Sequence, residues 1–475
     1  MNQTSTAPAR VTGLGGLTLT LTRARFAARQ GDSILYLAAT VAYLVTSALA
    51  LTIAGGTWMF YNRYRIPALN PLLESMGPDA VMMATSYFVL ALLACGLLVP
   101  SMVSLAAAAA VLGARGRERR LAALRLLGLS SGDVTRMSLV DTIVQAVIGS
   151  IGGLVIYLVS LPAWQALVMQ GKAIAPSEML LPWWMMLAVL AGTIVIGLAS
   201  TAWGLQQVRI SPLGVSRRSI PPALRIWRLW AFLGLIVLFF GVNMVVPLNS
   251  GFVAWLIMIA VILVVVQGLN LVAPWILQQI SKAFAQSSSP AIMWAARRIQ
   301  ANAKTTWKRV GGISLLCFIG GFVALTPINF TGEGGEEVVA ALAWDFTKGV
   351  IITLAVGFVL TSISIFITQA SAVFERGEQS IAMDKMGAPT SYVMRVMWLE
   401  TLGPVIVAVV IGAGLGALLG IPMYQLATSM GQQSSAGIVA MAIVMALGIG
   451  LAMLALWACA PLQRQVLAGR RRAND

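Results

Sequence analysis

Long apolar stretches alternate with short polar connections along almost the whole chain. An α-helix of about 20 apolar residues crosses the hydrocarbon part of a bilayer, so each stretch predicts a membrane span. The pattern predicts about ten spans, near residues 33–60, 80–113, 134–168, 181–206, 229–246, 252–277, 311–330, 347–372, 392–426 and 437–456. The predicted fold is therefore an all-α, polytopic bundle of transmembrane helices.

The connection between the second and third spans recurs between the eighth and ninth. Residues 115–142 read RGRERRLAALRLLGLSSGDVTRMSLVDT, and residues 373–401 read VFERGEQSIAMDKMGAPTSYVMRVMWLET. Such self-similarity indicates an internal repeat. When Gly128 is aligned with Gly387, the pairs that coincide without a gap are Arg117 and Arg376, Ala123 and Ala382, Val134 and Val393, Arg136 and Arg395, Asp141 and Glu400, Thr142 and Thr401, and Gly153 and Gly412.

Each copy predicts a short helix, a stop and a new helix. Gly128 and Gly387 provide the stop, because the left-handed conformation that ends many helices is cheap only without a side chain. Ser131 and Thr390 follow, each with a hydroxyl that can cap the next helix. The same arrangement of helix, stop and capped span therefore occurs twice.

A short helix between two spans can dock on a soluble partner and pass the partner's movement to both spans. The alternative is a helical loop that is basic only because it determines membrane orientation. Two aligned copies favour the first interpretation. The predicted coupling residues are Arg117, Arg119, Arg120, Leu121, Leu124, Arg125, Gly128, Arg376, Glu378, Ile381, Met383, Met386 and Gly387.

Two acidic residues, Asp141 and Glu400, follow the predicted caps by about ten residues. An ionisable group at this depth is a functional candidate. Each could pair with a nearby arginine or satisfy backbone groups, and the simpler role locks the coupling helix to its own bundle. We therefore predict a cap and bundle lock formed by Ser131, Asp141, Thr390 and Glu400.

The repeats organise the chain. We expect a first four-span repeat over 33–218 and a second over 310–468, joined by a two-span hairpin over 219–288. An interfacial amphipathic helix is predicted over 289–309, after an interfacial N-terminal segment at 1–32, and a basic tail ends the chain at 469–475. Glycines in the third span, Gly149, Gly152 and Gly153, predict close helix packing. The connection with Lys172 and Glu178 is expected to be a loop. The acidic stretch 331–345 is expected to be a solvated loop on the outer side, where the alternative is contact with a cationic peptide or divalent cations.

Composition changes the picture in two ways. The 475 residues are 59% hydrophobic and 10% charged, with a mean hydropathy of +0.86, which excludes a soluble domain. The formal net charge is +16, and the basic residues cluster in alternate connections. This pattern predicts that both termini and both motif copies are cytoplasmic, with anionic lipid and not nucleic acid as the partner of the basic residues.

Several chemistries are missing. The chain has no histidine, and its three cysteines, Cys95, Cys317 and Cys459, are far apart in apolar stretches. We expect no metal site, no disulfide framework and no catalytic residue. No charged residue is predicted in the middle of a span, which argues against ion-coupled transport. No GxxxxGK[ST] sequence is present, so we expect no cofactor in this chain, with ATP and Mg²⁺ bound by a partner.

The duplicated motif resembles the FtsX-like permease family of ABC transporters, which includes MacB- and BceB-type membrane subunits. The family's basic helix, roughly RxRELAxLRALG, is similar to residues Arg117 to Gly128, and Asp141 matches its acidic position. In the second copy Glu378, Gln379 and Asp384 depart from the pattern. The resemblance implies a bacterial inner-membrane permease and a cytoplasmic ABC ATPase, with one copy at each coupling helix. Many relatives have a large extracytoplasmic domain, for which the connections here leave no room.

Three functions follow as hypotheses. The first is the permease subunit of an ATP-driven exporter that removes an antimicrobial peptide, lipid or drug. The second is a mechanotransmission protein that regulates a cell-envelope enzyme and moves no solute. The third, an integral-membrane enzyme, is disfavoured by the lack of histidine and of a carboxylate cluster within the spans.

Overall fold

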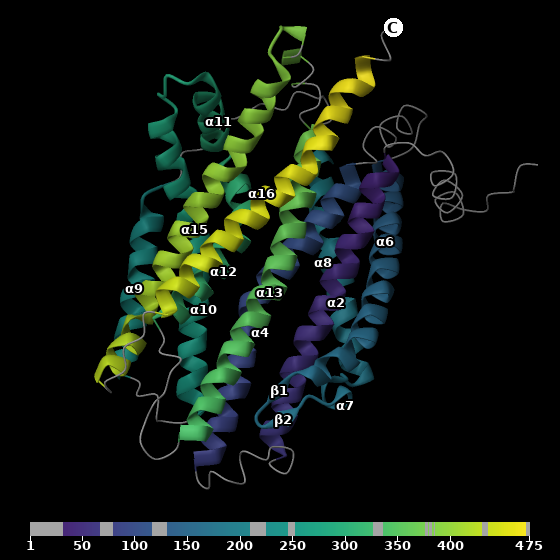
Figure 1. Cartoon of the computed structure of the whole chain (residues 1–475). Coiled ribbons are helices and arrows are strands. Elements are labelled where there is room, and N and C mark those ends of the chain that lie inside the picture. The colour runs from purple at the N-terminus through teal and green to yellow at the C-terminus, as the bar shows by residue number, and fades with distance from the viewer. Residues whose placement is uncertain are drawn as a thin grey trace, which may run out of the picture.

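The computed structural model describes residues 32–66, 79–115, 131–209, 225–245, 252–325, 336–375, 379, 382–383, 385–429 and 436–471. Within them, ten helices are long and apolar enough to cross a membrane, which confirms the predicted all-α polytopic bundle (Figure 1). These are α2 (Asp32–Arg65), α4 (Asp79–Arg115), α6 (Ser131–Ser160), α8 (Trp183–Arg209), α9 (Trp227–Val245), α10 (Phe252–Phe284), α12 (Ala303–Ala324), α13 (Glu336–Glu375), α15 (Thr390–Ser429) and α16 (Ala436–Arg471).

The spans form two groups with the same internal packing. In the first, α2 packs against both α4 and α6, and α8 packs against α6 and α4. In the second, α12 packs against α13 and α15, and α16 packs against α15 and α13. Helices α4 and α13 join the groups and stand between them in Figure 1. The α9–α10 hairpin adds to one side, where α10 contacts both α12 and α4.

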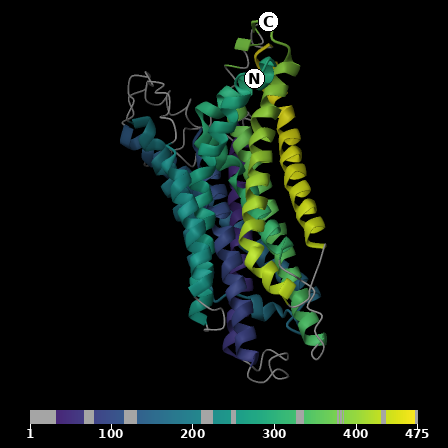
Figure 2. The ribbon, with the colours of Figure 1, turned by 90° about the vertical axis from the view of Figure 1, so that its left-hand side faces the viewer.

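The long helices share one direction, so the molecule has two distinct ends (Figures 1 and 2). We call the end with α11 (Pro290–Ala301) and the last turns of α16 the motif end, at the top of both views. The opposite end has the strands β1 (Val168–Met169) and β2 (Lys172–Ala173), and we call it the cap end.

Glycines bring α6 into near-backbone contact with α2. A Cβ added at Gly149 would lie 2.8 Å from the carbonyl oxygen of Thr40, and one at Gly153 would lie 2.6 Å from that of Leu44. Helices in lipid gain no hydrophobic drive from each other, so small residues that allow such approach stabilise their packing. The close packing predicted for the third span is confirmed.

The second repeat uses the same device. A Cβ at Gly412 would collide with the carbonyl oxygen of Ser314 on α12, and one at Gly416 would collide with that of Phe318. Gly412 is the residue that aligns with Gly153 in the internal repeat. The α2–α6 and α12–α15 contacts are therefore equivalent glycine seams, one in each repeat.

The connection predicted as a loop with Lys172 and Glu178 is folded. It forms a 3-10 helix, η2 (Leu161–Ala166), then the hairpin β1–β2 and a short helix α7 (Pro176–Met179). Met169 pairs with Lys172 across a two-residue turn in which Gln170 and Gly171 have φ of 57° and 72°. Positive φ at both positions is the requirement of a type I′ hairpin turn.

A buried ion pair holds this cap on α2. The Arg63 guanidinium has no exposed surface, lies 2.5 Å from Glu178 Oε2 and donates to the carbonyl oxygen of Met169 at 2.7 Å. Lys172 Nζ lies 2.8 Å from the other carboxylate oxygen. Burial alone would raise the pKa of Glu178, but the hydrogen bonds and charges of Lys172 and Arg63 outweigh it and lower the pKa below its usual value. The expectation of a loop was wrong, and the pattern near Glu178 did not indicate this pair because Arg63 comes from a distant span.

Asp345 also differs from its prediction as part of an acidic loop. Helix α13 already begins at Glu336, and Asp345 is buried within it. Its Oδ2 accepts hydrogen bonds from the Gln170 backbone N–H at 2.6 Å and from the Tyr87 hydroxyl at 3.1 Å, and Lys348 Nζ lies 2.9 Å from Oδ1. Partners from the cap and α4 make burial of this carboxylate possible, and they fasten the two repeats together at the cap end.

The predicted interfacial helix over 289–309 is shorter than expected. α11 ends at Ala301, and Asn302, with φ −129° and ψ 35°, interrupts the helix before α12 begins at Ala303. Residues 303–309 are therefore the first turns of the seventh span. The predicted N-terminal interfacial segment lies outside the described residues, except for Asp32.

Candidate functional site

The glycine stop predicted for the second motif copy is present. Gly387 has φ +84°, the left-handed conformation. The Ala388 N–H donates to the Met383 carbonyl oxygen at 3.0 Å, and the Met386 N–H donates to that of Ala382 at 3.1 Å. A bond from the residue after the glycine back over five positions is the Schellman ending of a helix.

Only part of the predicted coupling surface is described. Met386 is 77% exposed and Met383 is half-buried, so the stop presents a large apolar side chain outward. The role of the coupling residues stays a prediction. Those that lie outside the described residues are Arg117, Arg119, Arg120, Leu121, Leu124, Arg125, Gly128, Arg376, Glu378 and Ile381.

The predicted caps lie at the first positions of the following spans. α6 begins at Ser131 and α15 at Thr390. The backbone N–H groups of Tyr392 and Val393 donate to the carbonyl oxygen of Pro389, which makes Thr390 the first helical residue. Capping by the two hydroxyl groups stays a prediction.

Glu400 is buried and pairs with an arginine that sequence reasoning did not identify. Arg298 Nη1 on α11 lies 3.5 Å from Glu400 Oε2 on α15. The same guanidinium donates from Nη2 to Gln379 Oε1 in the second motif copy at 3.4 Å, and it lies over the Trp294 ring at 5.5 Å. Arg298 thus connects the motif copy to the bundle. Asp141, the matching residue of the first copy, is half-buried in α6.

The next aligned pair, Thr142 and Thr401, ties spans together in both repeats. Thr142 Oγ1 lies 3.2 Å from Thr201 Oγ1 and links α6 to α8. Gln369 Nε2 on α13 donates to Thr401 Oγ1 at 2.8 Å and links α13 to α15. All four side chains are buried, so the hydrogen bonds also satisfy groups that would be costly in an apolar interior.

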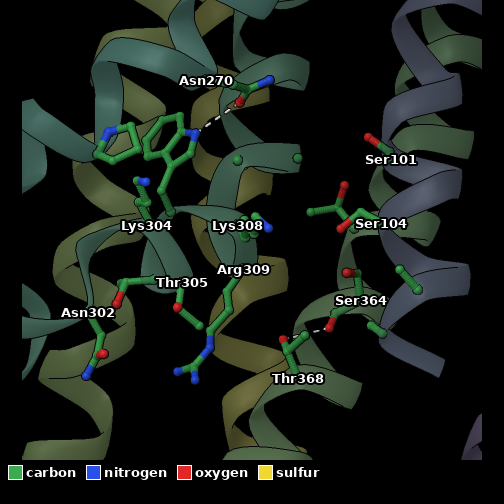
Figure 3. A pocket seen from close by; sticks show the side chains of 18 of the residues that line it. Ser101, Ser104, Asn270, Asn302, Lys304, Thr305, Lys308, Arg309, Ser364 and Thr368 are labelled. Carbon is green, nitrogen blue, oxygen red and sulfur yellow. Dashed lines mark hydrogen bonds between the residues drawn. The ribbon is translucent and has the colours of Figure 1, made fainter. Parts of the chain in front are cut away.

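A large cavity lies between α4, α10, α12 and α13, with α11 at its motif end (Figure 3). Its volume is about 1770 Å³. One face of α12 shows how the lining changes along the membrane axis, because Lys304, Lys308, Gly311 and Leu315 all line it at helical spacing. The lining is therefore basic at the motif end and apolar nearer the middle of the spans.

The apolar part of the wall comes from α4, α10 and α12, and its residues include Gly96, Leu97, Leu263, Val266 and Leu315. The Trp307 indole N–H donates to Asn270 Oδ1 at 2.9 Å, which fixes α12 against α10 beside the cavity (Figure 3). Trp307 is almost fully buried, so this contact is part of the packed wall.

Hydroxyl groups line the remaining sides. On α13 they follow one helix face through Thr361, Ser364, Thr368 and Ser371. On α4, Ser104 lies on the opposite side of the cavity from Lys308 in Figure 3. These positions had no role in the sequence analysis, although their spacing of three and four residues inside an apolar stretch is a signal that could have identified a polar-lined wall.

The charged lining is of one sign. Among the described residues that line the cavity there are six cations and no aspartate or glutamate. The cations are Arg228, Arg297, Arg298, Lys304, Lys308 and Arg309. The predicted basic character of this region is therefore concentrated at the mouth of a cavity, which composition alone did not indicate.

The second motif copy forms part of the same mouth. Gln379, Ala382, Met383 and Met386 all line the cavity. The segment therefore borders the opening, and Arg298, which contacts both Gln379 and Glu400, connects the segment to α15. The predicted coupling segment and the cavity are two parts of one site.

We compared the sequence with models of known protein families. A model described as FtsX-like permease C-terminal matches residues 93–213 and 351–466, together about half of the chain. The chain belongs to the FtsX-like permease family. The two matches begin in α4 and α13, end near the ends of α8 and α16, and each includes one motif copy. A comparison with curated proteins found no match.

Membership gives the permease a general role. FtsX-like permeases are membrane subunits of ABC transporter-type systems, in which a separate ATPase hydrolyses ATP. The family model matches two segments of the chain, and each segment covers the later part of the second span and the third and fourth spans of a predicted repeat.

Proposed function

We propose that this permease exports an amphipathic molecule, such as a lipid, peptide or drug, with ATP hydrolysed by a separate subunit that holds the ATP and Mg²⁺. The cavity is the observation that carries the proposal. Its volume of about 1770 Å³ exceeds the roughly 300–1,000 Å³ typical of small-molecule pockets. Its lining is apolar near the middle of the spans and polar at the motif end, which suits a molecule with both characters.

The proposed location is the inner membrane of a bacterium, with the motif end and both termini in the cytoplasm. The described motif end supports this orientation through Arg297, Lys304 and Lys308, because basic residues favour the cytoplasmic side. In this orientation the cavity lies at the level of the inner leaflet, so a substrate would enter it from the cytoplasmic side.

The proposed partner is a pair of ABC ATPase subunits, one at Arg117–Gly128 and one at Arg376–Gly387. The exposed Met386 supports docking at the second copy, because exposed apolar anchors next to a helix end fit a groove on a partner. Since the same segment borders the cavity, closure of the ATPases would alter its mouth while the two repeats rock against each other.

A cavity-filling substitution tests this function. Ser104→Trp should prevent substrate stimulation of ATP hydrolysis by the reconstituted complex, because Ser104 faces the cavity in Figure 3. Val155→Trp on α6 is the matched control, since Val155 is 53% exposed and does not line the cavity. Basal ATP hydrolysis and complex formation should be normal in both variants. Full substrate stimulation of S104W would contradict the proposal.

Mechanotransmission is the second candidate, and one observation favours it. Helix α13 is continuous from Glu336 to Glu375, so it connects the Asp345 contacts at the cap end to the start of the second motif copy. Such a helix could transmit force without moving a solute. ATP hydrolysis that responds to a cell-envelope hydrolase, and to no lipid, peptide or drug, would favour this candidate and contradict export.

A further inference from the structure

The distribution of charge in the cavity identifies the class of molecule that fits it. Its basic residues come from the ends of α9 and α11 and from the first turns of α12, all at the motif end. Its apolar residues, such as Leu97, Leu263 and Leu315, lie further along the spans. A ligand that matches both parts has an anionic headgroup and an apolar chain.

Four of the cations that line the cavity have no ion-pair partner within the part of the chain that the structure describes. They are Arg228, Arg297, Lys304 and Lys308, whereas Arg298 pairs with Glu400. Arg297, Lys304 and Lys308 lie on α11 and in the first turns of α12. Lys304 and Lys308 are four residues apart on one helix face, where like charges repel. An anion between them and Arg297 would relieve this repulsion.

Membrane orientation alone does not explain this arrangement. Orientation requires basic residues in the connections between spans, facing water. Here Lys308 lies inside a helix and lines a cavity that continues to Leu315 two turns further on. Basic pockets between transmembrane helices on the cytoplasmic side are suited to anionic lipid headgroups.

Hydroxyl groups face the basic residues across the cavity. Ser104 is exposed to the cavity, and in Figure 3 its side chain lies across from Lys308. A serine at this depth can donate to the ester or phosphate oxygens that connect a lipid headgroup to its chains. Cations and hydroxyl groups therefore line the end of the cavity that would take a lipid headgroup, and the apolar wall lies where the lipid chains would be.

We propose that the cavity binds an anionic, phosphate-bearing lipid, with the headgroup at Arg297, Lys304 and Lys308 and the chains against α4, α10 and α12. Binding needs only this chain, whereas transport of the lipid rests on the function proposed above. The same charge disfavours cationic peptides, because six cations at the mouth would repel them. Of the three candidate substrate classes, lipid, peptide and drug, the charge of the cavity thus favours a lipid.

The test measures lipid binding to the purified permease alone in a nonionic detergent, by native mass spectrometry and by thermal stabilisation. Phosphatidic acid and phosphatidylcholine with the same acyl chains are compared, and inorganic phosphate is a third ligand. We expect phosphatidic acid to bind most tightly and phosphate to compete weakly. Equal affinity for the two lipids, or full competition by phosphate, would overturn the proposal.

Two double variants locate the site. K304Q/K308Q should lower the affinity for phosphatidic acid roughly 25-fold, since each cation near a membrane surface contributes about a factor of five. R225Q/K282Q removes the same charge from exposed residues that do not line the cavity, and should change affinity less than threefold. Equal losses in both variants would show that binding depends only on total charge and would overturn the proposal.

If K304Q/K308Q fails to fold, S104W provides the second measurement, and it should reduce phosphatidic acid binding without removing a charge. The experiments distinguish a failure of the lipid-binding proposal from a failure of the transport proposal. Tight binding of phosphatidic acid without stimulation of ATP hydrolysis in the reconstituted complex would contradict transport and leave the binding proposal intact. Stimulation by phosphatidylcholine alone would support transport and contradict the choice of an anionic lipid.

Discussion

Glu178→Gln should strongly destabilise the first repeat. The substitution keeps the shape of the side chain but removes the negative charge beside Arg63, whose guanidinium has no exposed surface. The guanidinium charge would then lie in the folded cap beside uncharged acceptors, the amide oxygen of the new glutamine and the Met169 carbonyl oxygen. A buried charge without a partner is far more costly than an exposed one.

The magnitude follows from the burial of the two partners. Glu178 has a side chain only 9% exposed, and removal of one member of a buried ion pair costs about 3–5 kcal/mol. Because glutamine can still accept one hydrogen bond, we expect a loss near 3 kcal/mol. For a unit of about 200 residues this corresponds to a decrease in Tm of roughly 6–12 °C.

Thermal unfolding of the purified permease in detergent measures this loss, and the chain offers a close control. Lys172 contacts the same carboxylate but its side chain is 37% exposed, so Lys172→Met should cost at most about 1 kcal/mol. The double variant R63M/E178M removes both charges and should recover most of the stability lost by E178Q. If E178Q were as stable as K172M, the cap would not depend on the buried pair.

Three further outcomes are expected. Folding lowers the pKa of Glu178, so its carboxylate contributes to folding stability above the ordinary pKa of about 4.5. This contribution is lost as pH falls through the folded-state pKa. The Tm difference between wild type and E178Q should therefore shrink below pH 4.5. Gly387→Val should destabilise the helix stop by about 1–2 kcal/mol, because a side chain is strained at φ +84°, and should reduce co-purification of the ATPase. Gly387→Asn should reduce co-purification less, because asparagine tolerates this conformation. If G387V retained as much ATPase as the wild type, coupling at this stop would be contradicted. Gly416→Ala should lower Tm, because the added Cβ would collide with the backbone of α12. Gly414→Ala should leave Tm unchanged, because a Cβ there meets open space. Identical Tm values for the two variants would contradict the glycine seam.

Features with a periodic or repeated signal could be predicted from the sequence. The ten spans follow from apolar length, and the glycine seam follows from small residues within a span. The stop at Gly387 follows from its place between a short helix and an apolar stretch, since few other residues adopt positive φ. In each case the local chain contains the information.

Contacts between distant segments could not be predicted in this way. Arg63 and Glu178 are 115 positions apart, and nothing near either residue indicates the other. The partner of Asp345 includes the backbone N–H of Gln170, a group that every residue except proline has. The cavity is lined by several spans that are distant in the sequence. The sequence therefore did not indicate that Lys308 and the hydroxyl face of α13 line the same cavity.

The two glycine seams determine where the permease can deform. A helix whose backbone rests on a neighbour's glycines cannot slide along it without first separating from it, so α2 with α6, and α12 with α15, should each behave as one stiff unit. The α4–α13 contact differs, because buried side chains from both helices, such as Leu98 and Leu360, belong to one hydrophobic cluster there, and side chains can exchange rotamers. Shear between the repeats should therefore concentrate at α4 and α13. Since both helices line the cavity, any such shear changes its width directly.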